Sequence, residues 1–201
     1  MLELLFGGAL GGALAAAVAQ VFTTLLDRAA GSETWLKGPY GPPFFNVALF
    51  MGLLYGGIAV GLSRSRRDAA LGALGPSLGI ALPMIVMSRL FDLPNVRWGQ
   101  QSISLWIPVV VALYTIAVWG TIFALGRRLT ARWTGGAAAC VGAFLGYLAL
   151  AAITKIAPAV TGWKLNAYLP PPIVLLDGLL SGAGMALGVL FLRGRHANVA
   201  Q

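Results

Sequence analysis

The chain has 201 residues, of which 58% are hydrophobic and only 10% are charged. A typical soluble domain carries about 25% charged residues, so this composition, with a mean hydropathy of +0.82, excludes an ordinary water-soluble fold. It predicts an all-α, polytopic membrane protein whose main partner is the lipid bilayer. The net charge of +8 does not indicate nucleic-acid binding, because the basic residues lie between apolar runs, where they face lipid headgroups.

Six apolar stretches are long enough to be membrane-spanning helices. A bilayer core about 30 Å thick is crossed by about 20 residues of helix. In chain order the stretches are residues 4–26, 43–62, 69–90, 104–125, 134–154 and 171–192. The loops between them are turn-rich and none resembles a disordered linker, so we expect a single six-helix transmembrane domain over residues 1–201.

Basic residues in the short loops predict the orientation of these helices. They cluster after the second, fourth and sixth stretches: Arg64, Arg66 and Arg67; Arg127, Arg128 and Arg132; Arg193 and Arg195. We assign these three segments, and both termini, to the cytoplasm. The other loops are longer, have fewer basic residues and carry acidic and aromatic residues. The Ala-, Gly- and Arg-rich composition is typical of a bacterial inner-membrane protein.

A faint internal repeat relates residues 43–90 to residues 104–154. A shift of 63 residues without gaps brings together Gly57 and Gly120, Arg64 and Arg127, Gly72 and Gly135, and Gly79 and Gly142. Each copy would comprise a helix, a basic turn and a glycine-bearing helix, and parallel repeats of this kind occur in transporters. Membrane composition alone also produces such Gly and Leu matches, and the sequence leaves both interpretations open.

Small residues at four-residue spacing predict close contact between helices, because lipid gives helices no hydrophobic reason to associate. The candidate packing residues are Gly7, Gly11, Gly12, Gly75, Gly79, Gly142, Gly146, Gly178 and Gly182. The second and fourth stretches are bulkier. We therefore expect the first, third, fifth and sixth helices to form the tight bundle, and the second and fourth to present aromatic residues to lipid, a ligand or a partner chain. The ridge on the first helix is equally suited to docking another membrane subunit or a second copy.

Asp177 is the clearest candidate for a functional site. A charge inside an apolar span costs at least about 2.5–3.5 kcal/mol, and this one lies six residues into the sixth stretch, about 9 Å deep. Gln20 lies at a similar depth in the first stretch, and Asn46, Arg89 and Lys155 lie near the outer ends of other stretches. We expect a ligand-binding or proton-linked pocket that opens outward, with Asp177 at its base. The structural alternative is an ion pair of Asp177 with Lys155 or Arg89.

The residue counts exclude several kinds of chemistry. A single histidine, His196, and a single cysteine, Cys140, cannot supply a bis-histidine haem, an iron–sulfur cluster, a cysteine zinc site or an internal disulfide. Six scattered acidic residues form no carboxylate cluster, and neither a phosphate-binding glycine loop nor a Gly-x-Ser-x-Gly elbow occurs. We therefore expect no cofactor, no metal and no enzymatic activity, and the lack of a clustered acid, base or metal set disfavours an enzyme acting on lipid or isoprenoid.

Two non-enzymatic functions remain. We expect a small accessory subunit or scaffold that packs through glycine-rich helices; the alternative is a small-solute transporter, or its membrane substrate-binding component, with its pocket around Asp177. Six helices in about 200 residues, with small residues spaced by four in the first, look like the substrate-binding subunits of energy-coupling factor transporters. This resemblance is one of architecture and implies solute binding within the membrane; no ligand-binding motif matches residue by residue.

Overall fold

The computed structural model describes residues 2–30, 42–90, 96–98, 101–103, 106–161 and 171–199. This part of the chain contains six α-helices: α1 (Leu2–Ala30), α2 (Pro42–Ser63), α3 (Arg66–Leu90), α4 (Trp106–Thr130), α5 (Trp133–Thr161) and α6 (Pro171–Val199). A short antiparallel hairpin of β1 (Val96–Trp98) and β2 (Gln101–Ile103) connects α3 to α4. The predicted helical class is confirmed, whereas the hairpin was not predicted.

Within the described ranges, three helices are long and apolar enough to cross a membrane. They are Leu2–Leu25 within α1, Trp133–Thr154 within α5 and Ile173–Leu192 within α6. The apolar part of α2 that meets the same criteria of composition, Val47–Ser63, is shorter. A helix of 20 residues is about 30 Å long, which matches the hydrocarbon core of a bilayer.

Helix α1 turns its large apolar side chains outward, the reverse of a helix in a water-soluble protein. Side chains at four-residue spacing are between 48% and 68% exposed: Leu2, Phe6, Leu10, Leu14 and Val18. On the opposite face Ala16 and Ala19 are fully buried. Exposure of this much apolar surface to water costs about 25 cal/mol per Å², whereas lipid tails cover it without penalty. The helices therefore belong to a membrane-embedded protein.

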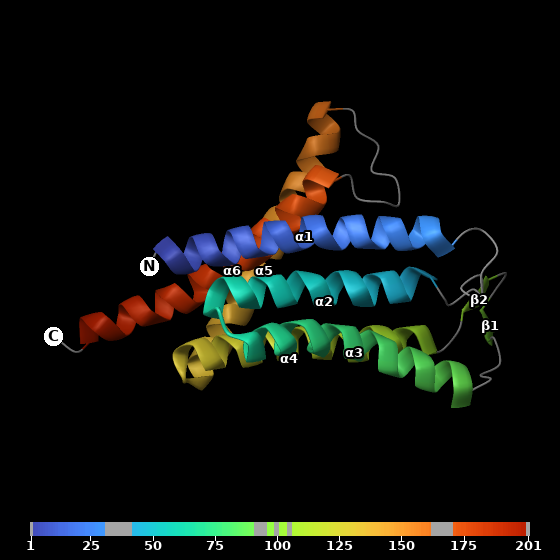
Figure 1. Ribbon diagram of the computed structural model, residues 1–201, viewed down its shortest axis with the longest axis horizontal. Helices are drawn as coiled ribbons and strands as arrows, with labels where there is room; N and C mark the ends of the chain where they lie inside the picture. The colour runs from blue at the N-terminus through green and yellow to red at the C-terminus, as the bar shows by residue number, and fades with distance from the viewer. Residues whose placement is uncertain are drawn as a thin grey trace.

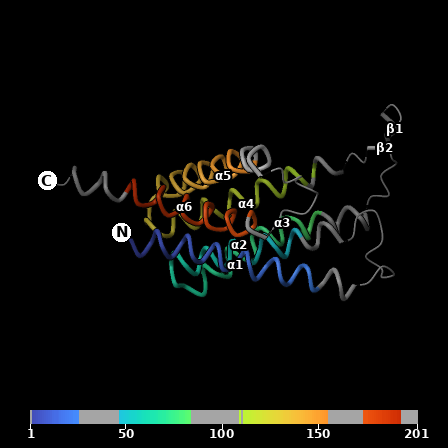
Figure 2. The backbone as a smooth tube through the Cα atoms, turned by 90° about the horizontal axis from the view of Figure 1, so that it is seen from above, coloured from blue at the N-terminus to red at the C-terminus, as the bar shows by residue number. Residues whose placement is uncertain are grey.

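The six helices form a closed ring in chain order (Figures 1 and 2). Each helix packs on the next, and α6 packs on α1 to close the ring; α5 and the start of α6 are steeply inclined to the other four helices in Figure 1. The fewer contacts across the ring join α2, α4 and α6 to one another. Both termini, the α2–α3 turn and the α4–α5 turn lie at one end of the bundle, and the β-hairpin lies at the other (Figure 1). We call the first of these the arginine end, because both turns carry arginines.

Glycines bring α1 into backbone contact with both of its neighbours. Gly7 and Gly11 face Gly61 and Gly57 of α2, while Gly8 and Gly12 face Gly182 and Gly178 of α6. A Cβ atom added at any of these eight positions would come closer than 3.0 Å to the opposite helix. Only glycine allows the two backbones to lie so close together, and this contact is how helices associate in lipid.

The remaining predicted packing glycines lie at the other interfaces of the ring. Gly142 of α5 faces Gly184 of α6, and Gly146 faces Leu180 one turn away. Gly75 and Gly79 of α3 face Thr121 and Ala117 of α4.

The expectation that α2 stays outside the tight bundle is wrong. Besides its contacts with α1, α2 packs on α3 through Gly52 and Gly56, which face Ser77 and Ala73, and Tyr55 is only 9% exposed. The prediction considered the bulky aromatic residues of this stretch and not its four glycines. Those glycines lie on two faces, one for each neighbouring helix.

The two turns at the arginine end share one backbone conformation. Arg64 and Ala131 both have left-handed backbones, with φ of 54° and 56°. Just before them, the hydroxyl groups of Ser63 and Thr130 donate to the carbonyl oxygen four residues earlier. The same hydroxyl oxygens accept a hydrogen bond from the amide two residues later. The chain therefore makes the same hydrogen-bonded turn twice.

These equivalent turns correct the register of the proposed repeat. Helices α2 and α4 end at Ser63 and Thr130, and α3 and α5 begin at Arg66 and Trp133, so equivalent positions are 67 residues apart rather than 63. The difference of four residues is about one helical turn. The shift of 63 also equates Gly57, which contacts α1, with Gly120, which has nothing within 4 Å. A duplication of residues 43–90 and 104–154 stays a prediction, and the offset that fits the turns is 67.

Candidate functional site

Asp177 lies on α6, six residues after that helix begins at Pro171. Its side chain is partly buried, and the hydroxyl of Ser181, one turn further along, donates to its carboxylate at 3.3 Å. Ser181 is itself only 7% exposed. On the same helix Gly178 and Gly182 are in backbone contact with α1, and this contact fixes the rotation of α6 about its axis.

Two tyrosines from other helices lie near this carboxylate. Tyr55 of α2 and Tyr114 of α4 are both close enough to Asp177 for the side chains to interact electrostatically. Tyr55 belongs to the buried core and Tyr114 packs against it. Ser181, one turn from Asp177 on the same helix face, is also buried, so this face of α6 lies toward the core. We call these four residues, Tyr55, Tyr114, Asp177 and Ser181, the interior polar group. It comes from α2, α4 and α6, the three helices that touch across the ring.

An apolar layer fills the ring between the interior polar group and the arginine end. Along α2, α4 and α6, the residues that follow the polar ones toward that end are large, apolar and almost completely buried: Ile58, Leu62, Ile122, Leu125, Met185 and Val189. Such a layer of interlocked side chains leaves no polar path along the ring axis. The interior polar group therefore lies on one side of an apolar barrier.

Sequence reasoning found Asp177 but missed its neighbours. Tyr55 and Tyr114 were expected on surfaces that face lipid, a ligand or a partner. The available signal was the phenolic hydroxyl itself, since a tyrosine within an apolar span needs a polar partner for its O–H. Ser181 could also have been found, because it lies four residues after Asp177 on the same helix face.

The other predicted site residues do not join this group among the described contacts. The Gln20 backbone carbonyl accepts hydrogen bonds from the Thr23 and Thr24 hydroxyls, and no described hydrogen bond joins its side chain to Asp177. Asn46, Arg89 and Lys155 lie within α2, α3 and α5, with side chains outside the described residues. In the described part of the chain Asp177 has its hydrogen bond from Ser181 and no ion pair.

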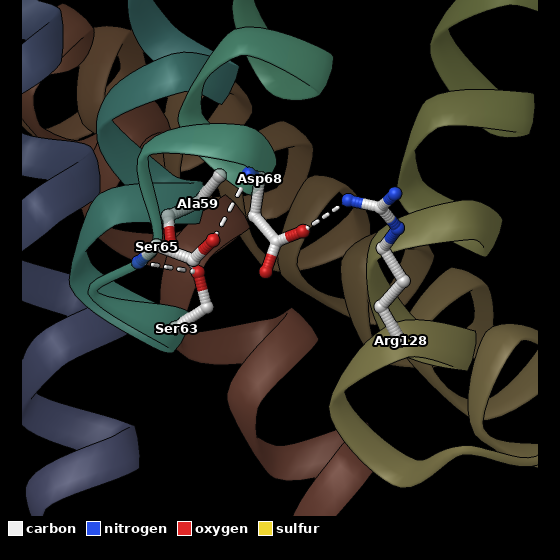
Figure 3. Close-up of polar contacts among 5 residues, drawn as sticks. All are labelled: Ala59, Ser63, Ser65, Asp68 and Arg128. Atoms are coloured by element: carbon white, nitrogen blue, oxygen red, sulfur yellow. Dashed lines mark hydrogen bonds and ion pairs between the residues drawn. The ribbon is translucent and has the colours of Figure 1, made fainter.

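The ion pair between described residues lies at the arginine end. An Nη1 atom of Arg128 on α4 lies 2.6 Å from Oδ1 of Asp68 on α3 (Figure 3). Asp68 is also in the first turn of α3, where its amide donates to the hydroxyl of Ser65 at 3.4 Å. Ser65 is therefore the N-cap of α3, and the carboxylate of Asp68 is favoured by the helix dipole. This arrangement connects α3 to α4 beside the α2–α3 turn.

The α4–α5 turn has a different set of neighbours. The guanidinium carbon of Arg127 lies 4.1 Å from the ring centroid of Trp133, and that ring lies 5.4 Å from the ring of Phe123. These residues line a cavity of about 570 Å³ together with Arg128, Ala124 and Ala131. We call this cavity the turn pocket.

A larger apolar groove runs along the outer surface of α5 and α6. Its volume is about 1180 Å³, and glycine, alanine and leucine line most of it, with Leu2 and Leu5 of α1 at one end. Gly142, Gly146 and Gly184 form part of its floor. The composition of the groove suits an apolar chain or helix.

No metal-binding group of three or more His, Cys, Asp or Glu side chains occurs in the part of the chain that the structure describes. Comparison of the chain with protein-family models, with curated proteins and with solved structures gives no match. The functional conclusion therefore depends on the geometry of the chain itself.

Proposed function

We propose that this protein binds a small solute inside a ring of six membrane-spanning helices, as a transporter or as the substrate-binding component of one. The observation that carries the proposal is the interior polar group, in which Ser181 donates to Asp177 and Tyr55 and Tyr114 lie close enough to interact with it electrostatically. An ionisable side chain inside a membrane domain is expensive and is by default functional. Substrate sites of transporters lie at such depths, between helices that pack across the domain.

The proposed orientation places the arginine end in the cytoplasm of a bacterial cell, following the positive-inside rule. The interior polar group then lies in the outer half of the membrane. A solute would reach Asp177 from the outside and would be stopped by the apolar layer below it, of which Ile58, Ile122 and Met185 are members. This arrangement corresponds to the outward-facing state of an alternating-access cycle.

The chemistry of the interior polar group favours binding over catalysis. A carboxylate accepts hydrogen bonds and attracts positive charge, while the tyrosine and serine hydroxyls both donate and accept. Such a set suits a solute with an amino group, a cation or a transported proton. The Ser181 hydroxyl donates to the Asp177 carboxylate, but no third group among the described contacts orients this pair, as the base of a hydrolase or transferase is oriented.

Cysteine accessibility tests the proposal directly. In a Cys140→Ala background, a membrane-impermeant maleimide added to intact cells should label Ser181→Cys, which replaces a member of the interior polar group. The matched control is Val189→Cys, two turns deeper in the apolar layer, which should stay unlabelled. If both cysteines are protected while the proteins remain folded, no solute reaches the interior and the proposal fails.

A second measurement tests the role of the carboxylate. Ser181→Cys should react several-fold faster with a cationic methanethiosulfonate reagent than with an anionic one of similar size, because the Asp177 charge concentrates cations near the thiol. Asp177→Asn in the same background should abolish this preference without abolishing labelling. A preference that survives the substitution would assign the effect to other charges and would contradict a cation-attracting role for Asp177.

The apolar groove favours a second candidate function, that of an accessory subunit or scaffold. Its small side chains allow another helix to approach the backbones of α5 and α6 closely. Purification in mild detergent separates the two candidates. A stoichiometric membrane partner that is lost on Ala138→Leu within the groove supports the accessory role, whereas a partner-free protein with a reactive Ser181→Cys supports the solute-binding role.

A further inference from the structure

The turn pocket combines cations with exposed aromatic surface at one end of the bundle. Arg127 stacks on Trp133 and has no carboxylate partner among the described contacts. Arg128 donates one N–H to the carboxylate of Asp68, and its side chain is 52% exposed. A guanidinium has five N–H donors, so both arginines keep donors that can serve a ligand. We propose that the turn pocket binds the phosphate group of an anionic phospholipid.

The charges and donors in the pocket suit a phosphate. Asp68 offsets one of the two arginine charges, which leaves the pocket with a net positive charge. Guanidinium groups form paired hydrogen bonds with phosphate oxygens, and stacking on Trp133 holds the Arg127 plane in a defined orientation. The first backbone amides of α5, which begins at Trp133, lie at the same turn and carry partial positive charge.

The surface next to the pocket favours a lipid over a free phosphate ion. Trp133 is 65% exposed, which is typical of tryptophan at the level of lipid headgroups. On α4 a track of exposed or partly exposed residues at four-residue spacing leads away from the pocket along the apolar helix: Ala124, Gly120 and Ile116. A Cβ atom added at Gly120 would meet nothing within 4 Å, so an acyl chain can lie against the backbone there.

The α2–α3 turn provides an internal control, because it has the same backbone and arginines but different surroundings. Its neighbours are Ser65 and Asp68, a hydroxyl and a carboxylate that already satisfy the start of α3 (Figure 3). Arg64 has the left-handed backbone that Ala131 has in the other turn, and it does not line the turn pocket. Arg64→Gln therefore removes the same charge from the same end of the protein without touching the site.

The test measures lipid retained by the full-length protein in mild detergent by native mass spectrometry, with phosphatidylglycerol and phosphatidylcholine of equal chain length added in parallel. Wild type should retain phosphatidylglycerol in preference to phosphatidylcholine. Arg127→Gln should reduce the retained phosphatidylglycerol about tenfold, as expected for loss of a charge-assisted hydrogen bond, whereas Arg64→Gln should change it less than about twofold. Equal effects of the two substitutions, or equal retention of the two lipids by wild type, would overturn the proposal.

Two further experiments distinguish a bound lipid from free phosphate and test the acyl track with a variant that keeps both arginines. Inorganic phosphate at about 10 mM, roughly ten-thousandfold above a Kd of 1 μM, should not displace the lipid. Efficient displacement would assign the pocket to free phosphate instead. Gly120→Leu keeps both arginines and places a large side chain in the open space at this exposed position. It should weaken retention of long-chain phosphatidylglycerol but not of a six-carbon-chain analogue, and no difference between the two would contradict the acyl track.

Discussion

Helices α1 and α4 stand opposite each other in the ring and are held in contrasting ways. Helix α1 is in backbone contact with both neighbours through its own glycines, such as Gly12 against Gly178. Helix α4 packs on α3 through the side chains of Thr121 and Ala117, and its backbone approaches α5 closely only beside the turn that joins them, where Gly126 faces Gly135. Because close backbone approach is what holds helices together in lipid, the difference divides the ring into a tightly held side and a loosely held helix.

The loosely held helix also carries much of the chemistry. Tyr114 of α4 contributes to the interior polar group, and Arg127 and Arg128 near its end line the turn pocket. A transporter needs one element that moves against a rigid remainder. Under the proposed transport function, α4 would be that element and would move against the tight unit of α6, α1 and α2.

The largest effect is expected when the glycine contact of α1 is disturbed. Gly12→Ala puts a methyl group against the carbonyl oxygen of Gly178, where only a backbone shift can relieve the overlap, so it should lower the free energy of unfolding by about 1–3 kcal/mol. Unfolding in mixed micelles with increasing dodecyl sulfate measures this. Gly120→Ala is the matched control and should change stability by less than about 1 kcal/mol. Equal losses at the two positions would remove the distinction between α1 and α4.

A smaller effect is expected for the ion pair that joins α4 to α3. Because Arg128 is 52% exposed and Asp68 13% exposed, solvent screens the pair, and a double-mutant cycle of Asp68→Asn and Arg128→Gln should give a coupling energy of no more than about 1 kcal/mol. High salt should reduce it. A coupling energy above about 3 kcal/mol would show that this ion pair binds α4 tightly to α3 and would contradict the description of α4 as loosely held.

The smallest effect is expected at the turn itself. Ala131 adopts a left-handed backbone, with φ of 56°, that costs an alanine about 1 kcal/mol and costs glycine nothing. Ala131→Gly should therefore raise the free energy of unfolding by about 0.5 kcal/mol. Arg64→Gly should do the same at the equivalent position of the other turn, once the change is corrected with Arg64→Ala. A loss of stability at both positions would contradict the conformation assigned to these turns.

The hydropathy pattern predicted where the helices lie, but not where they end. Apolar runs indicate the part of a helix inside lipid, and α5 and α6 continue past the predicted stretches to Thr161 and Val199, because helical hydrogen bonding does not require a continuous apolar run. The sequence also could not predict the order of the helices around the ring. Gly11 and Gly12 are adjacent in sequence, yet one contacts α2 and the other α6, and spacing alone does not name a partner.

Only the carboxylate of the candidate site was predictable from the sequence, because the partners of a residue depend on how the helices are arranged. Asp177 stands out because a carboxylate in an apolar run is rare. Tyr55 and Tyr114 join it only through the fold, since they are 59 residues apart in the chain and on helices that are not sequence neighbours. The turn pocket left a fainter signal, a tryptophan that follows the arginines of a turn at the membrane interface.

The central claim is that the ring crosses the membrane with both arginine-bearing turns on the cytoplasmic side. Cysteine mapping at the two equivalent turn positions, Arg64→Cys and Ala131→Cys in the Cys140→Ala background, tests it most directly. Both cysteines should be protected from an impermeant maleimide in intact cells and should react once the membrane is permeabilised. Labelling of either cysteine from outside, or of the two from opposite sides, would contradict the account.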